Sequence, residues 1–376
     1  MKTVTIVVPA YNEAPYIAKC LASVQAFELR PGWAICEILV LDGGSTDSTC
    51  EIVKHTAISD RRIALLPNPG RFQVIALNIA INKAAGDFIL RLDAHAVYPP
   101  EYLKKCIDVF GSQHADNVGG IVITKPGGSG YGALLVQALT THRFGVGDSG
   151  FRLGVCAGKT DTVPYGFFCR KIFSKVGYFD ERLLRAEDYE MNRRIAMAGG
   201  IVWLDPAIHA TYFNKASIWA FLGKQFFSEA PYNAYLWYLA PYAFAWRHAI
   251  AAFFVLGIFL GILLWSWWFA QAVYVCVLAL YVFLSLISSV QQTIRYSDVR
   301  HIIVLPLFFF VFHFLYGLGI LWGLLRIATG TAPVQRDREP WRGAGQFRPW
   351  PPPNRTSWDF TGFLKFNGLA NDKTTL

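Results

Sequence analysis

Residues 88–103 read FILRLDAHAVYPPEYL, an apolar run of strand length that breaks abruptly into polar residues. Asp93 and His95 stand two positions apart, so on an extended chain their side chains point to the same side. Both side chains can ligate a metal ion. The two prolines that follow, Pro99 and Pro100, favour the end of the strand and the start of a helix. The stretch therefore predicts a strand whose carboxyl end carries chemistry.

The same pattern occurs on the amino-terminal side of this stretch, where short β-branched runs alternate with helical patterns. The runs TVTIVVPA, CEILVLD and RIALLPN are typical of strands, and PYIAKCLASVQA, STCEIVKHTAI and FQVIALNIAINKAAG are typical of helices. This alternation predicts an α/β fold with a mostly parallel sheet flanked by helices on both faces. Ligands of such sheets bind at the carboxyl ends of the strands, where this chain places polar side chains after each run.

The composition predicts that the rest of the chain enters a membrane. Hydrophobic residues make up 53% of the 376 residues and charged residues only 16%. Residues 249–294 contain no Asp, Glu, Lys or Arg, and they are long enough for two spanning helices with a turn near residues 266–268. A third span is predicted over residues 302–325. The aromatic-rich segment 216–246 has the composition of helices at the level of the lipid head groups.

The net charge of +9 fits a membrane surface better than nucleic acid. Basic residues flank the apolar spans at Arg247, Arg295, Arg300, Arg326, Arg336 and Arg338. We expect no nucleic-acid partner. The sequence MKTVTIVVPAYNE lacks the pattern of a signal peptide, so we expect the first domain to stay in the cytoplasm. The seven scattered cysteines form no C-x-x-C pair and are expected to remain reduced.

Six segments in order carry a family resemblance: VVPAYNE, VLDGGSTDST, NPGRFQVIALNIAI, LRLDAHAVYP, TVPYGFFCRKIFSKVGYFDE and AEDYEMNRRIAMAG. Together they resemble the inverting family 2 glycosyltransferases, over about residues 4–215. NPGR, DAHAVYPPEYL and GVGDSGFR are most similar to bacterial exopolysaccharide glucosyltransferases of the succinoglycan type. The resemblance implies a nucleotide-binding domain of the GT-A kind over residues 1–215, which uses a nucleotide sugar as donor.

The resemblance also implies which residues carry the chemistry. In the family an Asp-x-Asp element holds a divalent metal at the diphosphate; by position Asp93 corresponds to its first aspartate and His95 to its last. Histidine suits Mn²⁺ better than Mg²⁺, so we expect a divalent cofactor, Mn²⁺ or Mg²⁺, with Mn²⁺ preferred. His95 could instead be a loop histidine that binds a backbone carbonyl. Asp188 corresponds to the catalytic base, at the start of a predicted helix.

The nucleotide-binding residues implied by the resemblance are Pro9 through its backbone, Tyr11, Glu13, Asp42, Arg71 and Asp93. Asp42 alone could equally be a cap at the end of a strand. Gly43 stands where the family usually has a second aspartate, so one contact to the base or ribose is absent from the expected set. The identity of the nucleotide is left open by this departure, although a UDP-linked sugar, glucose or a close relative, is expected.

The acceptor side is less defined by sequence. Residues 128–147 mix glycine with apolar residues and could lie against the bilayer or pack as a core helix. Gln225 is followed by Phe226, Phe227 and Ser228, so the Q-x-x-R-W signature of processive enzymes is not present and addition of a single sugar is favoured. A catalytic domain at a membrane surface suits a polyprenyl-linked acceptor.

The sequence thus predicts a multi-pass inner-membrane glycosyltransferase that extends a lipid-linked oligosaccharide of an exopolysaccharide or cell-surface glycan. Its expected parts are a catalytic domain (1–215), interfacial helices (216–246), about three transmembrane helices (247–326) and a tail (327–376). Two alternatives stay open: transfer directly to polyprenyl phosphate, and a non-catalytic nucleotide-sugar-binding subunit of an export complex. Three spans would place the arginine-rich tail outside, against the positive-inside tendency.

Overall fold

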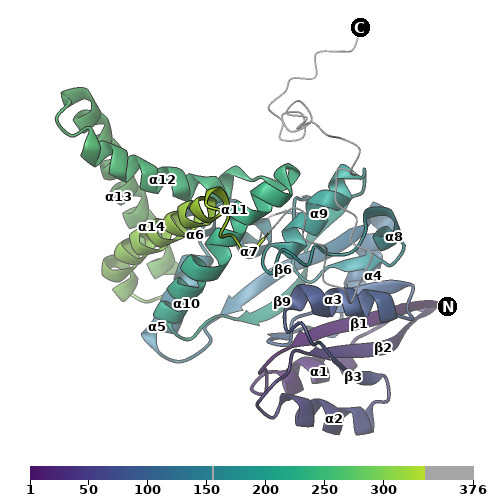
Figure 1. The fold of residues 1–376 in the computed structure, drawn as a ribbon. Helices are drawn as coiled ribbons and strands as arrows, with labels where there is room; N and C mark the ends of the chain where they lie inside the picture. The colour runs from purple at the N-terminus through teal and green to yellow at the C-terminus, as the bar shows by residue number, and fades with distance from the viewer. Residues whose placement is uncertain (155, 335–376) are drawn as a thin grey trace.

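A computed structural model describes residues 1–154 and 156–334. Its centre is one nine-stranded sheet in the order β3-β2-β1-β4-β8-β6-β9-β5, with β7 paired to β9. The strands are β1 Lys2–Ala10, β2 Trp33–Asp42, β3 Ile63–Pro67, β4 Phe88–Arg91, β5 Ala96–Val97, β6 Asn117–Lys125, β7 Gly158–Lys159, β8 Phe167–Cys169 and β9 Val202–Phe213. Figure 1 shows this sheet and its helices at one end of the molecule and the last three helices at the other.

The helices of the sheet region are α1 Ile17–Gln25, α2 Thr49–Ser59, α3 Gln73–Lys83, α4 Tyr102–Gln113, α5 Tyr131–Thr140, α6 Arg143–Val146, α7 Gly150–Leu153, α8 Ile172–Val176 and α9 Glu187–Met197. After β9 come α10 Ile218–Lys224, the π-helical turn η1 Gln225–Glu229, α11 Ala230–Leu239 and the 3₁₀ turn η2 Pro241–Ala243. The chain then forms the long helices α12 Trp246–Leu263, α13 Trp268–Tyr296 and α14 Arg300–Ala328. The part of the predicted tail from residue 335 onward lies outside the described residues.

The predicted GT-A type of α/β fold is confirmed, with helices packed on both faces of the sheet. Side chains of β1 alternate between the faces because successive residues of a strand point to opposite sides. Ile6 and Val8 belong to the apolar core beneath α1 and α4, whereas Val7 belongs to the core beneath α3 and α9. Both cores are free of solvent along β1, which explains the uninterrupted apolar run in its sequence.

The sheet is parallel only in part. β3, β2, β1 and β4 pair in parallel, as the alternating sequence predicts, but β8 runs antiparallel to both β4 and β6. The short strands β5 and β7 also pair antiparallel to β9. These three strands have two or three residues each, too few for a periodic signal in the sequence.

The strand predicted to end in Asp93 and His95 is shorter than expected. β4 ends at Arg91, and β5 begins at Ala96, so Asp93 and His95 lie on the connection between the two strands. The hydroxyl of Tyr98 fixes this connection, because it accepts a hydrogen bond from the Asp93 amide at 2.8 Å and approaches the Asp93 carbonyl at 3.2 Å. The alternation of a regular strand therefore does not set the directions of the two side chains.

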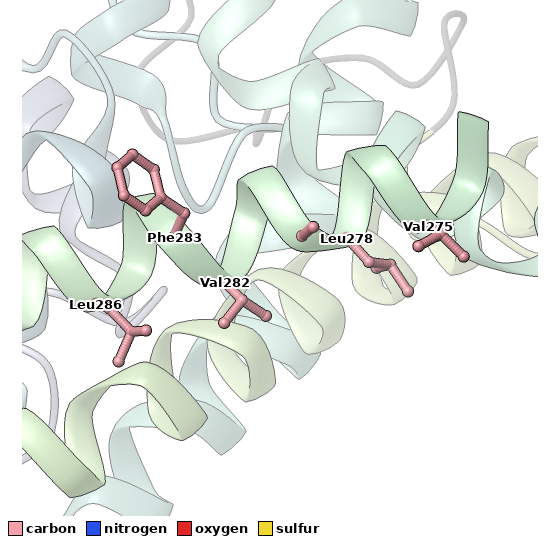
Figure 2. Close-up of a pocket in the computed structure, with 6 residues that line it drawn as sticks. Val275, Leu278, Val282, Phe283 and Leu286 are labelled. Atoms are coloured by element: carbon pink, nitrogen blue, oxygen red, sulfur yellow. The ribbon is translucent and has the colours of Figure 1, made fainter. Parts of the chain in front are cut away.

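In the part of the chain that the structure describes, three helices, α12, α13 and α14, are long and apolar enough to cross a membrane. The turn between α12 and α13 covers residues 264–267, close to the turn predicted from the sequence. Figure 2 shows apolar side chains along α13, among them Val275, Val282 and Phe283, which line a shallow depression on this helix. An exposed apolar face is what lipid contact requires, and the depression lies on a candidate span rather than at the sheet.

The sheet region and the long helices are joined by packing as well as by the chain. Leu135 and Leu139 of α5 share an apolar cluster with Phe309 and Phe312 of α14. The amide Nε2 of Gln292 on α13 also donates to the Ala138 carbonyl at 2.6 Å. The sequence leaves open whether residues 128–147 lie against the bilayer or pack as a core helix. In the structure, α5 of this segment packs against the candidate span α14.

Candidate active site

The carboxyl ends of β2 and β3 border a cleft of about 310 Å³. Asp42, Gly43, Pro67, Asn68 and Arg71 line it together with Gly44 and Pro69. The guanidinium carbon of Arg71 lies 4.9 Å from the centre of the Tyr11 ring, a cation–π arrangement that connects the NPGR loop to the loop after β1. Three residues assigned to the nucleotide by resemblance, Tyr11, Asp42 and Arg71, thus gather at one cleft.

Gly43 is required by the position of the Arg71 backbone. A Cβ at position 43 would lie 2.9 Å from the Arg71 carbonyl oxygen and 3.3 Å from its Cα. Backbone atoms cannot move aside as a flexible side chain can. An aspartate at this position would therefore displace the NPGR loop of this chain.

Asp42 makes the contacts of a loop cap. Its Oδ2 accepts hydrogen bonds from the backbone amides of Gly44 at 2.9 Å and Ser45 at 3.1 Å. Although burial by itself raises the pKa of Asp42, the hydrogen bonds from Ser45 and Gly44 lower it overall. The carboxylate is therefore ionised at neutral pH, and it borders the cleft while it holds the loop.

Asp93 and His95 each contact a different neighbour. Asp93 Oδ1 lies 3.0 Å from Nη2 of Arg91, and His95 Nδ1 lies 3.0 Å from Oε1 of Glu13. Glu13, assigned to the nucleotide by resemblance, thus contacts His95 in this structure. Burial by itself lowers the pKa of His95, but the bond to Glu13 and the charge of Asp93 raise it overall. Pro9 is the last residue but one of β1 and lies beside Leu41 of β2.

These side chains suit a metal ion that the substrate helps to bind. Among residues 1–154 and 156–334 no group of three or more His, Cys, Asp or Glu side chains is arranged to hold a metal ion alone. Asp93 and His95 offer one carboxylate and one imidazole, and ions that bind nucleotides commonly take one or two protein ligands and complete their shell with phosphate oxygens and water. A carboxylate on Nδ1, as Glu13 provides, leaves Nε2 of the imidazole as the ligating atom.

Asp188 lies in the first turn of α9, which begins at Glu187 as the sequence predicts. Ala186 precedes the helix with φ of 61°, a left-handed conformation that costs a non-glycine residue of the order of 1 kcal/mol. Asp188 remains partly accessible to solvent, yet protein encloses it closely enough that burial raises its pKa, against the opposing charge of Arg91. A carboxylate both reachable and poorly solvated is suited to accept a proton.

Glu187 and Arg91 complete a buried charge cluster. Burial and the neighbouring Asp188 raise the pKa of Glu187 to about 7. Gln73 Nε2 donates to Glu187 Oε1 at 2.7 Å. Arg91 is only 7% exposed, and its charge acts on Asp93, Asp188 and Glu187. The end of β4 and the start of α9 therefore lie within electrostatic reach of each other.

Strained backbone concentrates around these residues. Four of the six non-glycine residues with positive φ in the described chain are Asn12, Arg71, Tyr165 and Ala186, at 55°, 65°, 51° and 61°; the other two, His114 and Ser297, follow the ends of α4 and α13. Each of the four is next to, or in contact with, a residue of the candidate site; Tyr165, for example, lies under the Arg91 guanidinium at 5.7 Å. Such conformations persist where the surrounding structure imposes them, and they cluster at functional sites.

Arg91 and Glu187 are site residues that sequence reasoning missed. A signal for Arg91 was available, because a single arginine inside the apolar run FILRL needs a buried anionic partner if the run is a central strand. Glu187 carried no comparable signal, since an acidic residue in a first helical turn is common.

Comparisons with known proteins place this geometry in context. Residues 5–175 match the family model Glycosyl transferase family 2. The succinoglycan biosynthesis protein ExoA of Rhizobium meliloti is 29% identical over 226 residues, which cover 58% of this chain and 66% of that protein. A dolichyl N-acetyl-alpha-D-glucosaminyl phosphate 3-beta-D-2,3-diacetamido-2,3-dideoxy-beta-D-glucuronosyltransferase of Methanococcus voltae is 26% identical over 343 residues, 87% of this chain and 98% of that one.

Among solved structures, the mannosyltransferase PcManGT of Pyrobaculum calidifontis, in complex with GDP-Man and Mn²⁺, superposes with a TM-score of 0.53. The superposition covers 85% of this chain and 87% of that chain at 19% sequence identity. At this identity the likeness concerns the fold, and it extends well beyond the sheet because it includes most of the chain.

Proposed function

We propose that this chain, whose residues 5–175 match the family model Glycosyl transferase family 2, is a membrane-bound, inverting transferase. The donor is a nucleotide sugar, UDP-glucose or a close relative. The acceptor is a polyprenyl-linked oligosaccharide of an exopolysaccharide or cell-surface glycan. The active site faces the cytoplasm at the inner membrane, and each reaction adds a single sugar.

The names of the relatives support a lipid-linked acceptor. The Methanococcus relative, aligned over 98% of its length, is named for transfer to a sugar on dolichyl phosphate. The Rhizobium relative is named for succinoglycan biosynthesis. The long apolar helices α12, α13 and α14 would hold the site at the surface in which such a lipid resides. The acceptor therefore arrives from the membrane and the donor from the aqueous side.

The proposed reaction begins with proton removal by Asp188. Its carboxylate accepts the proton of an acceptor hydroxyl, and the resulting oxygen nucleophile attacks the anomeric carbon from the face opposite the leaving group. The bond from that carbon to the diphosphate breaks, so the configuration inverts. The single observation that carries this proposal is the position of Asp188: partly accessible, poorly solvated, and near Arg91 and Asp93.

The residues on the nucleotide side bind and orient the donor. Tyr11 and Arg71 enclose the base or ribose, Asp42 borders the same cleft, and the Pro9 backbone lies on the neighbouring strand β1. Asp93 and His95 would hold a divalent ion at the diphosphate, with Glu13 supporting the imidazole. Such an ion neutralises the charge that develops on the leaving diphosphate. The neighbour of this fold solved with Mn²⁺ supports the choice of a divalent ion.

Donor hydrolysis by the full chain in detergent tests the proposal. The wild type should release nucleoside diphosphate from its preferred nucleotide sugar, and D188N should keep donor affinity while turnover falls by roughly 10²- to 10⁴-fold. D108N, a change at an exposed aspartate far along α4, is the matched control and should behave as wild type. Wild-type turnover in D188N would remove Asp188 from the mechanism. Absence of turnover in the wild type with every donor and acceptor would favour the non-catalytic alternative.

One relative favours testing a second acceptor. An undecaprenyl-phosphate 4-deoxy-4-formamido-L-arabinose transferase of Pectobacterium atrosepticum is 31% identical over 123 residues, although these cover only 36% of that protein. Parallel assays with polyprenyl phosphate and with a polyprenyl diphosphate-linked sugar would separate direct transfer to the lipid from extension of a glycan.

A further inference from the structure

A compact charge cluster next to the candidate active site is formed by Lys224 of α10, Glu229 of η1 and Arg185, which precedes α9. We propose that Lys224 and Arg185 bind the phosphate of the lipid-linked acceptor, and that Glu229 is their internal counter-anion while no acceptor is bound. This inference rests on the proposed function, because it assigns residues to the acceptor of that reaction. The ligand chemistry is a phosphate or diphosphate ester joined to an apolar chain.

The π-helical turn brings the cluster together. Lys224 and Glu229 are five residues apart, and in a regular α-helix they would be rotated by roughly 140° about the axis. The turn η1, residues 225–229, follows the i→i+5 pattern of a π-helix. In this conformation Lys224 Nζ lies 2.9 Å from Glu229 Oε1. A local departure from the α-helix is thus needed for the ion pair.

Arg185 joins the same carboxylate from the other side. Its Nε lies 3.5 Å from Glu229 Oε1 and donates to the Ser228 hydroxyl at 3.1 Å. The side chains of Arg185, Lys224 and Glu229 are 37%, 38% and 27% exposed, so an incoming anion can reach them. Two cations share one carboxylate, which leaves an excess positive charge for a phosphate.

The cluster lies within electrostatic reach of the catalytic residues. The carboxylate of Glu229 acts to raise the pKa of Asp188, and the ammonium of Lys224 acts to lower the pKa of His95. Arg185 is also only three residues before Asp188 in the chain. A phosphate held by Lys224 and Arg185 would therefore place the attached sugar or hydroxyl beside the proposed base.

The other side of η1 packs against the candidate spans. A Cβ at Gly319 of α14 would lie 2.7 Å from the Phe226 carbonyl oxygen, so the helix and the turn are in direct backbone contact. The rings of Phe226 and Trp322 stack at 5.9 Å between centroids. Phe227, whose ring also contacts Trp322, is 68% exposed, as expected for a side chain at a lipid head-group surface. An acceptor anchored in the bilayer would therefore meet η1 before it meets Asp188.

Phosphate binding requires Glu229 to release its ion pairs with Lys224 and Arg185. A phosphate ester carries at least one full negative charge and several acceptor oxygens, so it forms charge-assisted hydrogen bonds with both cations. Removal of the Glu229 charge should consequently strengthen phosphate binding, whereas removal of either cation should weaken it. These opposite signs distinguish a ligand site from a purely structural ion pair, for which all three changes would act alike.

Direct binding to the full chain in detergent tests this assignment. The probes are farnesyl phosphate and farnesol, which share the apolar chain and differ in the phosphate, together with UDP as a probe of the donor side. The wild type should bind farnesyl phosphate at least tenfold more tightly than farnesol. K224Q and R185Q should each lose roughly ten- to hundredfold in affinity for farnesyl phosphate, and E229Q should gain affinity. UDP and farnesol should bind all variants within about twofold of wild type.

K215Q removes a lysine that lies between β9 and α10 and has no ion pair to Glu229. It is the matched control for the general attraction of anions to a basic surface. The assignment would be overturned if K215Q and K224Q lost affinity for farnesyl phosphate equally, or if the wild type bound farnesol and farnesyl phosphate equally. It would also be overturned if K224Q and R185Q lost UDP affinity in parallel, and that result would assign the cations to the donor. The binding test is separate from the proposed function, whose failure would appear as absence of Asp188-dependent turnover in the wild type.

Discussion

Arg91 Nη2 lies 3.0 Å from Asp93 Oδ1, and this pair is largely enclosed between the end of β4 and the start of α9. The two side chains are 9% and 15% exposed, so water screens their attraction only weakly. The same guanidinium acts on the carboxylates of Asp188 and Glu187. One buried cation on a central strand therefore acts on Asp93 and on the two acids at the start of α9.

Removal of this cation should be costly. In R91M three buried or half-buried carboxylates lose their counter-charge, and breaking a buried pair by removing one partner typically costs about 3–5 kcal/mol. We expect a clear fall in the melting temperature of the detergent-solubilised protein and a shift of the acidic limb of its pH–rate profile to higher pH. R30M, at the exposed ion pair of Arg30 with Asp108, is the control and should leave both properties nearly unchanged. Equal melting temperatures in the two variants would contradict the proposed role.

The pH dependence of transfer follows from the raised pKa of Asp188. Burial raises this pKa above its ordinary value of 3.8, and the proposed base is active only when ionised. The rate should consequently fall as the pH drops through the raised value, so the acidic limb of kcat/KM should lie above the range of an exposed aspartate. Measurement of kcat/KM from pH 4 to 8 checks this, and an acidic limb at pH 4 or below would show that Asp188 is ordinarily solvated or is not the base.

Glu187 should make stability depend on pH in the opposite sense to most carboxylates. Its pKa is raised from 4.5 to about 7 in the folded state, so between these values the folded protein binds a proton that the unfolded chain has released. Stability therefore falls as the pH rises across this interval, by about 3 kcal/mol in total. E187Q should melt above wild type at pH 8 and close to it at pH 4.5. The exposed variant E51Q should show no such divergence, and a pH-independent difference for E187Q would disprove the shift.

Gly43 offers a test of the nucleotide cleft. In G43A the new methyl group would lie 2.9 Å from the Arg71 carbonyl oxygen, so the NPGR loop must move and the Arg71–Tyr11 stack with it. We expect UDP affinity to fall by about tenfold or more, because displaced contacts of this kind cost more than 1.4 kcal/mol. G111A, at a helical glycine with open space around it, should bind UDP as wild type does. Unchanged UDP affinity in G43A would place the nucleotide elsewhere.

The sequence alone was sufficient to predict the structural elements that repeat or that are long. The alternation of β1, β2 and β3 with their helices, the three apolar helices and the position of Asp188 at the start of α9 all follow from periodicity or length. The antiparallel strand β8 and the π-turn η1 could not be predicted in this way. They are three and five residues long, and contacts with distant parts of the chain determine both. The contact between Glu13 and His95 joins residues 82 positions apart, so no local pattern encodes it.

The choice of metal should depend on His95. Removal of divalent ions should abolish transfer, and Mn²⁺ should restore it better than Mg²⁺, because imidazole is a poor ligand for Mg²⁺. H95D recreates an Asp-x-Asp element, but it would place a second carboxylate beside Glu13, whose Oε1 lies 3.0 Å from the native imidazole. The double variant E13Q/H95D removes that repulsion and should shift the preference toward Mg²⁺, whereas H95D alone should be impaired with both ions. Binding of Mn²⁺ in the presence of UDP, followed by electron paramagnetic resonance, reports the ligand change independently of turnover. Equal rates of the wild type with Mn²⁺ and Mg²⁺, together with unchanged Mn²⁺ binding in H95A, would exclude His95 as a ligand and leave it as a partner of Glu13 alone.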